Sequence, residues 1–142
     1  MTTYVIDASV AIKWAFIENY CLEAIRYMDD RLQRMSPDII LHECNAAIQK
    51  KVWRNEISAE IGWQGYELIF QGKPIQLFDT KSLIRPAYHL AVELNHAVYD
   101  CYYLALAQQQ NAVVVTADRK FYDRVQAGVY ARLIAWVEEP PK

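Results

Sequence analysis

Short apolar runs, each separated from the next by a longer stretch with helical periodicity, constrain the fold of this chain more than any other feature. The runs TYVI (3–6), PIQLF (74–78) and AVVV (112–115) have the length and composition of buried strands, and a last strand is expected near ARLIAW (131–136). Parallel neighbouring strands need a crossover of a dozen or more residues, which the intervening stretches supply. The alternation therefore predicts an α/β fold: a three-layer α/β/α sandwich around a central, mostly parallel sheet of about four or five strands.

The intervening stretches carry apolar residues at helical spacing, together with residues that begin or end helices. We expect helices at about 9–16, 19–35, 36–54, 58–72, 82–95, 98–110 and 119–127. Ser9, Ser36 and Ser58 are of a type that caps helix N-termini, and Pro37 suits the first helical position. Gly128 is expected to end the last helix. Helices of this number can cover both faces of a parallel sheet.

The length and composition of the chain indicate one domain. Its 142 residues suffice for one hydrophobic core but not for two, so residues 1–142 are predicted to form a single domain. A hydrophobic content of 54 % argues against extensive disorder. The apolar run at the N-terminus is much shorter than a signal sequence or a membrane span requires, which predicts a cytoplasmic protein without membrane contacts.

Charge and cysteine content exclude two further classes of protein. A net charge of −2 excludes a protein that binds nucleic acid through overall positive charge, so any such contact is confined to local basic patches. The three cysteines are widely spaced and form no CxxC pair, which predicts neither a disulfide framework nor a cysteine-rich zinc site.

Four acidic residues stand among apolar or small residues, whereas most other acids lie in charged runs. They are Asp7, Glu43, Asp100 and Asp118. Asp7 and Asp118 come just after apolar strands, so both are expected at the edge of a parallel sheet where ligands bind. Glu43 and Asp100 share helix faces with apolar residues and are expected to point inward or into a cleft. The four carboxylates are therefore candidates for one site.

Carboxylates that converge repel one another, and a site of this kind needs something to offset the repulsion. Two charges about 6 Å apart at an effective dielectric constant of about 20 repel by roughly 3 kcal/mol. Raised pKa values, pairing with Lys or Arg, or a divalent cation can offset it. Carboxylate ligands without His or Cys suit Mg²⁺ or Mn²⁺ better than Zn²⁺, and such an ion supports phosphodiester hydrolysis. Taken singly, each acid also has an ordinary explanation as a helix cap, a first-turn charge or an exposed helix residue.

Three segments resemble the PIN-domain nucleases, and among them the VapC-type toxins of prokaryotic toxin–antitoxin pairs. They are YVIDASVAIKW (4–14), SPDIILHECNAA (36–47) and HAVYDCYYLALAQQQNAVVVTADRKF (96–121). The last segment is the most specific, because it combines a Tyr-Asp helix start, a Leu-Ala helix body and a strand that ends in Thr-Ala-Asp. The resemblance implies a PIN-like fold for nearly the whole chain.

The resemblance also implies an activity, a cofactor and partners. It implies an endoribonuclease that hydrolyses single-stranded or looped RNA, with a catalytic site that binds Mg²⁺ or Mn²⁺ through Asp7, Glu43, Asp100 and Asp118. Hydroxyl groups of Ser9 and Thr116 are implied beside these carboxylates. A homodimer and a cognate antitoxin protein are implied as partners, with the apolar stretches 14–28 and 53–70 as candidate interfaces.

Two positions depart from the family pattern. Many relatives have an asparagine three residues after the helix glutamate, where this chain has Ala46, with Asn45 one position earlier. Cys101 stands where a small alanine is common. The first departure puts a secondary polar group in doubt but not the four acids.

Basic residues near the acids are candidates for contacts with RNA phosphates. Arg119 and Lys120 are the better candidates because they adjoin Asp118, and Lys13 follows the first acidic segment. Basic residues in such positions are also common as solvated surface charge.

Two other functions stay open from the sequence. A non-catalytic protein-interaction domain would use the Trp and Tyr residues as an interface and would not require the four acids to converge. A Mg²⁺-dependent aspartyl-phosphate phosphatase also has an aspartate after its first strand, but usually has a second one where this chain has Ser9. A zinc protease is excluded, because the H-E-x-x-H motif needs histidine at Ala46, and the chain contains neither G-x-G-x-x-G nor a P-loop.

Overall fold

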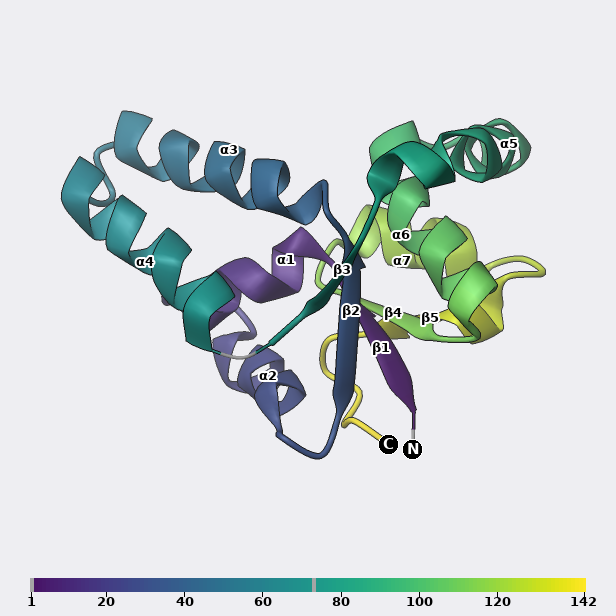
Figure 1. Ribbon diagram of the computed structural model, residues 1–142, viewed down its shortest axis with the longest axis horizontal. Helices are drawn as coiled ribbons and strands as arrows, with labels where there is room; N and C mark the ends of the chain where they lie inside the picture. Colours follow the sequence, from purple (N-terminus) through teal and green to yellow (C-terminus); the bar gives the residue numbers. More distant parts are fainter. Residues whose placement is uncertain (1, 73) are drawn as a thin grey trace.

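Five parallel strands form one sheet at the centre of the molecule (Figure 1). The computed structural model describes residues 2–72 and 74–142. The strands are β1 (Thr3–Ile6), β2 (Gln33–Pro37), β3 (Gln76–Phe78), β4 (Val113–Thr116) and β5 (Ile134–Trp136). Their order is β3-β2-β1-β4-β5, and every neighbouring pair is parallel. The prediction of an α/β fold with a mostly parallel sheet is confirmed.

The order of the strands reverses between β1 and β4, which pair in the middle of the sheet. From β1 the chain builds one half of the sheet through β2 and β3, and then crosses to β4 and β5 on the other side. Ile6 pairs with Val115, so the residues that follow β1 lie beside those that end β4. In parallel α/β sheets a reversal of this kind is where ligands bind.

Helices lie on both sides of the sheet (Figure 1). They are α1 (Ala8–Ala11), α2 (Cys21–Ile25), α3 (Ile40–Trp53), α4 (Ala59–Gly72), α5 (Ile84–Leu94), α6 (Val98–Gln110) and α7 (Arg119–Gln126). Figure 1 shows α1 to α4 on one side of the strands and α5 to α7 on the other. As predicted, Ser58 precedes α4 and its hydroxyl accepts a hydrogen bond from the Ile61 amide (3.1 Å). None of the helices among the described residues is long and apolar enough to cross a membrane.

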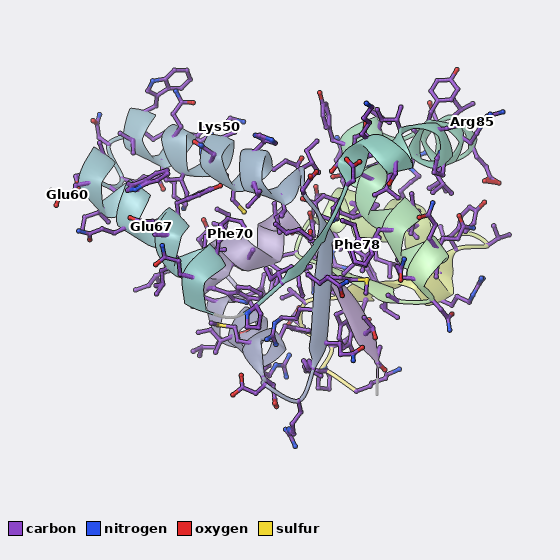
Figure 2. The ribbon with its side chains drawn as sticks, in the orientation of Figure 1. Lys50, Glu60, Glu67, Phe70, Phe78 and Arg85 are labelled. Atoms are coloured by element: carbon purple, nitrogen blue, oxygen red, sulfur yellow. The ribbon has the colours of Figure 1, made fainter. Side chains whose placement is uncertain are left out.

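Helices α3 and α4 form a hairpin that projects from the sheet (Figure 1). Within this hairpin, Phe70 packs against the core, whereas Glu60 points outward from α4 (Figure 2). Gly65 allows α4 to approach the chain that follows α1, since a Cβ at this position would lie 2.3 Å from the Phe16 ring. The close packing of Phe16 on α4 therefore depends on glycine.

The segment from residue 19 to residue 37 differs from the prediction. The expected helix over 19–35 ends at Ile25, is followed by a 3₁₀ turn (Arg26–Met28), and gives way to β2. Ser36 and Pro37, expected to begin a helix, are the last two residues of β2, and α3 begins only at Ile40. Strand β2 carries buried polar residues whose partners are backbone carbonyls: Arg34 donates to Asp29 O (2.7 Å), and Ser36 donates to Ile6 O (2.9 Å). Such a strand lacks the apolar run by which strands are recognised.

The first helix also begins differently from the prediction. Helix α1 begins at Ala8 and is extended by a 3₁₀ turn (Ile12–Trp14), with Asp7 rather than Ser9 in the N-cap position. The Ser9 hydroxyl is bonded to Asp7 and to the Ala117 amide instead. The side chain that was expected to cap a helix therefore joins the ends of β1 and β4.

Candidate active site

Asp7 lies where β1 ends, and its side chain is almost fully buried, with 5 % of the residue exposed. It occupies the N-cap position of α1, yet its carboxylate makes no capping hydrogen bond to any described residue. Instead, Oδ2 accepts hydrogen bonds from the hydroxyls of Ser9 (2.7 Å) and Thr116 (2.6 Å). Capping therefore does not explain a buried carboxylate at this position.

The two hydroxyls beside Asp7 connect three segments of the chain. Ser9 Oγ accepts from the Ala117 amide (2.9 Å), and Thr116 Oγ1 accepts from the Asp118 amide (3.0 Å). Each hydroxyl thus donates its proton to Asp7 while it accepts one from the backbone after β4. Because each hydroxyl both donates to Asp7 and accepts from the backbone, the orientation of the Asp7 carboxylate is well defined.

Glu43 and Asp100 are each held by a partner that the sequence did not identify. The Tyr103 hydroxyl donates to Glu43 Oε1 (2.5 Å), which connects α6 to the first turn of α3. His96 Nε2 lies 2.7 Å from Asp100 Oδ2, and the His96 ring stacks on Phe121 with 5.5 Å between the ring centroids. The spacing of four residues between His96 and Asp100 is a sequence signal that could have identified the histidine, whereas Tyr103 and Glu43 are 60 residues apart and no local spacing indicates their contact.

Asp118 has a structural role that the sequence had left as an alternative. It occupies the N-cap position of α7, and its Oδ1 accepts a hydrogen bond from the Phe121 amide (3.3 Å). Its side chain is only half-buried, unlike that of Asp7. The cap positions the Asp118 carboxylate just beyond the end of β4.

The four carboxylates interact electrostatically. Burial raises the pKa of Asp7 to about 7, and the charges of Asp100 and Glu43 act in the same direction. Burial also raises the pKa of Glu43 and that of Asp100, against the effect of the Tyr103 and His96 hydrogen bonds. The Asp100 charge contributes to the shift of Glu43, and the Asp118 charge to that of Asp100. The fold thus brings Asp7, Glu43 and Asp100 within electrostatic range of one another, and Asp118 within range of Asp100.

Two open depressions are lined by three of these acids, Glu43, Asp100 and Asp118. The first, which we call the lysine depression, is lined by Ser9 and Glu43 together with Lys13, Lys50, Lys51 and Arg54. The second, which we call the histidine depression, is lined by His96, Asp100, Asp118, Lys120 and Arg124. The lysine depression combines one acid of the site, and the histidine depression two, with basic residues that can contact phosphates.

The three basic residues expected to contact RNA lie in different surroundings. Lys13 lines the lysine depression, and Lys120 lines the histidine depression. The Arg119 guanidinium lies 4.0 Å from the centroid of the Trp136 ring and forms an ion pair with Asp123 (3.6 Å). Within residues 2–72 and 74–142, Arg119 lines neither depression.

Asn45 does not replace the polar group that Ala46 lacks. Ala46 lines the lysine depression beside Glu43, whereas Asn45 lines an apolar groove between α3 and α4 together with Ile48 and Trp63. The two neighbouring positions therefore face different sides of α3. The polar group expected near the acids is absent from this helix face in the described chain.

The chemistry of the acids fits a divalent cation. All the candidate ligands are carboxylate oxygens, which Mg²⁺ and Mn²⁺ prefer. The raised pKa values of Asp7, Glu43 and Asp100 show that a positive charge would stabilise the ionised forms of these three. In the described part of the chain, however, no three His, Cys, Asp or Glu side chains are already arranged to hold a metal ion. Hydrogen bonds to Ser9, Thr116, Tyr103 and His96 occupy oxygens of these carboxylates.

Comparison with known proteins agrees with this fold. No curated protein matches the chain in sequence. The crystal structure of PAE2754 from Pyrobaculum aerophilum is similar, with a TM-score of 0.70 and 18 % sequence identity, over 96 % of this chain and 85 % of that one. At this level of identity the likeness establishes the fold alone. The family model described as PIN domain matches residues 4–126, and the chain therefore belongs to the PIN-domain family, whose members are typically metal-dependent ribonucleases.

Proposed function

We propose that this protein is a Mg²⁺- or Mn²⁺-dependent endoribonuclease, with Asp7, Glu43, Asp100 and Asp118 as its catalytic and metal-binding residues. The observation that carries the proposal is the burial of Asp7 at the point where the strand order reverses. There its pKa is raised to about 7, in part by the charges of Asp100 and Glu43. A folded protein retains such mutually repelling buried acids where they serve a reaction. Membership of the PIN-domain family supports the same activity.

The residues around the acids orient them for this chemistry. A divalent cation bound by these carboxylates supplies an activated water and stabilises the leaving oxygen in phosphodiester hydrolysis. Ser9 and Thr116 fix Asp7, Tyr103 fixes Glu43, and His96 fixes Asp100. Burial raises the pKa of Asp7 to about 7, and also raises the pKa of Glu43 and that of Asp100, which makes these carboxylates stronger bases, as a general base for the attacking water requires.

Basic residues in the two depressions support an RNA substrate. We assign contacts with RNA phosphates to Lys13 in the lysine depression and to Lys120 in the histidine depression. Arg119 would have to leave Trp136 and Asp123 to reach the strand, so its contact is more peripheral. The overall charge of −2 is compatible with RNA binding because these basic residues lie beside the acids.

The biological role that we propose is that of the toxin in a toxin–antitoxin pair, acting as a homodimer that a cognate antitoxin protein blocks. Exposed apolar side chains on both sides of the sheet are evidence for surfaces that bind protein partners. Trp53 and Trp63 are exposed on the α3–α4 hairpin, and Tyr88 and Val92 are exposed on α5. The same side chains support the alternative of a non-catalytic interaction domain, which differs in not requiring the acids.

Cleavage of a mixed pool of structured RNAs tests the proposal. The purified protein is incubated with Mg²⁺ or Mn²⁺, and in parallel with EDTA, beside the Asp7→Asn variant. Asp123→Asn is the matched control, because it removes a carboxylate from the surface of α7. We expect cleavage that EDTA abolishes, that Asp7→Asn loses and that Asp123→Asn retains. Undiminished cleavage by a folded Asp7→Asn protein would contradict the assignment.

A further inference from the structure

Two lysines converge on one glutamate in the lysine depression. Lys13 Nζ lies 3.0 Å from Glu18 Oε1, and Lys51 Nζ forms a second ion pair with Glu18 Oε2. The side chains are largely buried, with 10 % of Lys13, 14 % of Lys51 and 26 % of Glu18 exposed. Burial alone would raise the pKa of Glu18, but the hydrogen bonds from Lys51 and Lys13 bring it below its usual value. One carboxylate thus forms ion pairs with two ammonium groups, so the cluster carries one positive charge in excess.

This lysine pair lies along the depression that contains Ser9 and Glu43. Lys13 follows Ser9 by four residues, one helical turn, and Lys51 follows Glu43 by eight residues on α3. Eight residues at 1.5 Å each place Lys51 about 12 Å along the helix from Glu43. An extended anion that reaches Glu43 through this depression therefore passes the lysine pair.

The segment that carries Glu18 is anchored on both sides of this residue. The Phe16 ring packs against Gly65 of α4 and lies 5.6 Å from Lys51 Nζ, and Tyr20 contacts Trp136 edge to face. Ile17, next to Glu18, is 96 % exposed. The Glu18 carboxylate can therefore leave the lysines by a change of its own side chain, while both anchors stay in place.

We propose that Lys13 and Lys51 form a phosphate-binding subsite for the RNA strand beyond the cleaved bond, and that Glu18 occupies this subsite until an RNA phosphate displaces it. A phosphodiester group offers the lysines two anionic oxygens, as the carboxylate does, so the exchange leaves both ammonium groups paired. The choice of RNA as the anion rests on the proposed nuclease function. An acidic protein segment carries the same kind of charge, and the poly(glutamate) arm of the test below distinguishes it from RNA.

Binding of a labelled single-stranded RNA oligonucleotide of random sequence, measured by fluorescence anisotropy in EDTA, tests the proposal. Glu18→Gln removes the competing charge and is expected to tighten binding by about three- to tenfold. Glu56→Gln, which removes the same charge from the same depression, controls for general electrostatics and is expected to tighten binding by less than about twofold. Equal effects of the two variants, or weaker binding by a folded Glu18→Gln protein, would overturn the proposal.

Lysine variants keep the test decisive if Glu18→Gln fails to fold. Lys51→Met keeps the apolar part of the side chain beside Phe16 and is expected to weaken binding and to reduce the salt dependence of log Kobs by about 0.7. Lys50→Met is the matched control, because Lys50 lines the same depression but projects from the exposed side of α3 (Figure 2). If Lys50→Met reduces the salt dependence as much as Lys51→Met does, the pair has no special role.

Two further arms identify the ligand. In a protein that carries both Lys13→Met and Lys51→Met, the further substitution Glu18→Gln should no longer tighten RNA binding. The affinity for an oligonucleotide with uncharged methylphosphonate linkages should be the same for the Glu18→Gln protein and the unmodified protein. If Glu18→Gln strengthens the binding of a poly(glutamate) peptide but not of RNA, the subsite takes an acidic protein segment and the RNA proposal is wrong.

The outcome for the subsite is separable from the outcome for the proposed activity. If the protein cleaves RNA but its RNA affinity does not change in the Glu18→Gln variant, the subsite is refuted and the proposed nuclease activity is not. Binding that depends on Glu18 and the lysines, without metal-dependent cleavage, would support the subsite and refute the nuclease.

Discussion

Asp7 and Asp118 occupy equivalent positions in two neighbouring parts of the fold, yet their surroundings differ. Each follows a central strand of the sheet and stands at the N-cap position of the next helix. The Asp118 carboxylate accepts a backbone hydrogen bond from α7 and is half-buried. The Asp7 carboxylate is buried and accepts hydrogen bonds from two hydroxyls instead.

The difference shows that position at the end of a strand does not decide what a carboxylate does. A capping bond satisfies Asp118 locally, within three residues of the chain. Asp7 depends on Thr116, which is 109 residues away, and its burial beside other acids destabilises its ionised form. We therefore expect Asp7 to contribute more to function and less to stability than Asp118.

The largest expected effect is on cleavage. Asp7→Asn is expected to reduce the single-turnover rate of RNA cleavage by a factor of at least about 10³, because loss of metal-ion catalysis costs several kcal/mol. Asp118→Asn keeps the capping oxygen and is expected to reduce the rate by about ten- to a hundredfold. Circular dichroism of both variants is the control for folding. An equal reduction of the cleavage rate in the two variants would show that the two aspartates contribute equally to catalysis.

The second prediction concerns the stability of the metal-free protein. An aspartate that ionises near pH 3.8 when unfolded and near pH 7 when folded keeps its proton longer in the folded state. The free energy of unfolding therefore falls as the pH rises from about 4 to about 7, by up to roughly 4 kcal/mol from Asp7. Glu43 and Asp100, whose pKa values are also raised, act in the same direction.

Urea denaturation in EDTA at pH 5 and pH 8 measures this effect. Asp7→Asn is expected to be more stable than the unmodified protein at pH 8 and to lose less stability between the two pH values. Mg²⁺ at a hundred times its Kd is expected to stabilise the unmodified protein by about 2.7 kcal/mol at pH 8. A less stable Asp7→Asn protein at pH 8 would show that the Asp7 charge is already compensated.

The third prediction concerns the residues that hold the acids. Tyr103→Phe keeps the ring but removes the hydroxyl that donates to Glu43, and is expected to reduce the cleavage rate by about ten- to a hundredfold. Tyr102→Phe, at the neighbouring position of α6, is the matched control and should cleave at nearly the original rate. An unchanged rate in Tyr103→Phe would show that Glu43 needs no partner from α6.

The smallest expected effect separates the cap of Asp118 from its charge. Asp118→Ala removes the acceptor for the Phe121 amide and is expected to lower the free energy of unfolding by about 1 kcal/mol. Asp118→Asn retains an acceptor for this amide and is expected to change the free energy of unfolding by only a few tenths of a kcal/mol. Urea denaturation in EDTA measures both values. Equal stability of the two variants would show that the cap bond contributes nothing.

Much of the fold was predictable from local patterns. The strands β1 and β4 are apolar runs, and α3, α4, α5 and α6 have the periodicity of helices packed on one face, so their expected ranges agree with the structure to within a few residues at most boundaries. Strand β2 was missed because Arg34 and Ser36 are polar, and their burial depends on hydrogen bonds to the carbonyls of Tyr27, Asp29 and Ile6. The expected cap at Ser36 was wrong for the same reason.

The candidate site was predictable only in part. The sequence singled out Asp7, Glu43, Asp100 and Asp118 because acids among apolar neighbours are unusual, and their catalytic role stays a prediction. Tyr103 and His96 were not identified, although the structure places them on these acids. The pairing of Lys51 with Glu18 was not identified either, because it joins segments 33 residues apart whose approach depends on the packing of Phe16 against Gly65.

The amino-acid sequence determined the alternation of strands and helices, the parallel sheet and the four acids, because periodicity and residue type act over short distances along the chain. Tertiary structure decided which polar side chains are in contact. The Thr116 hydroxyl, which the family resemblance had implied beside the acids, reaches Asp7 because β1 pairs with β4, and Tyr103 rather than solvent contacts Glu43. These pairs join segments 109 and 60 residues apart, and such contacts form only when the sheet and its two helical layers pack together.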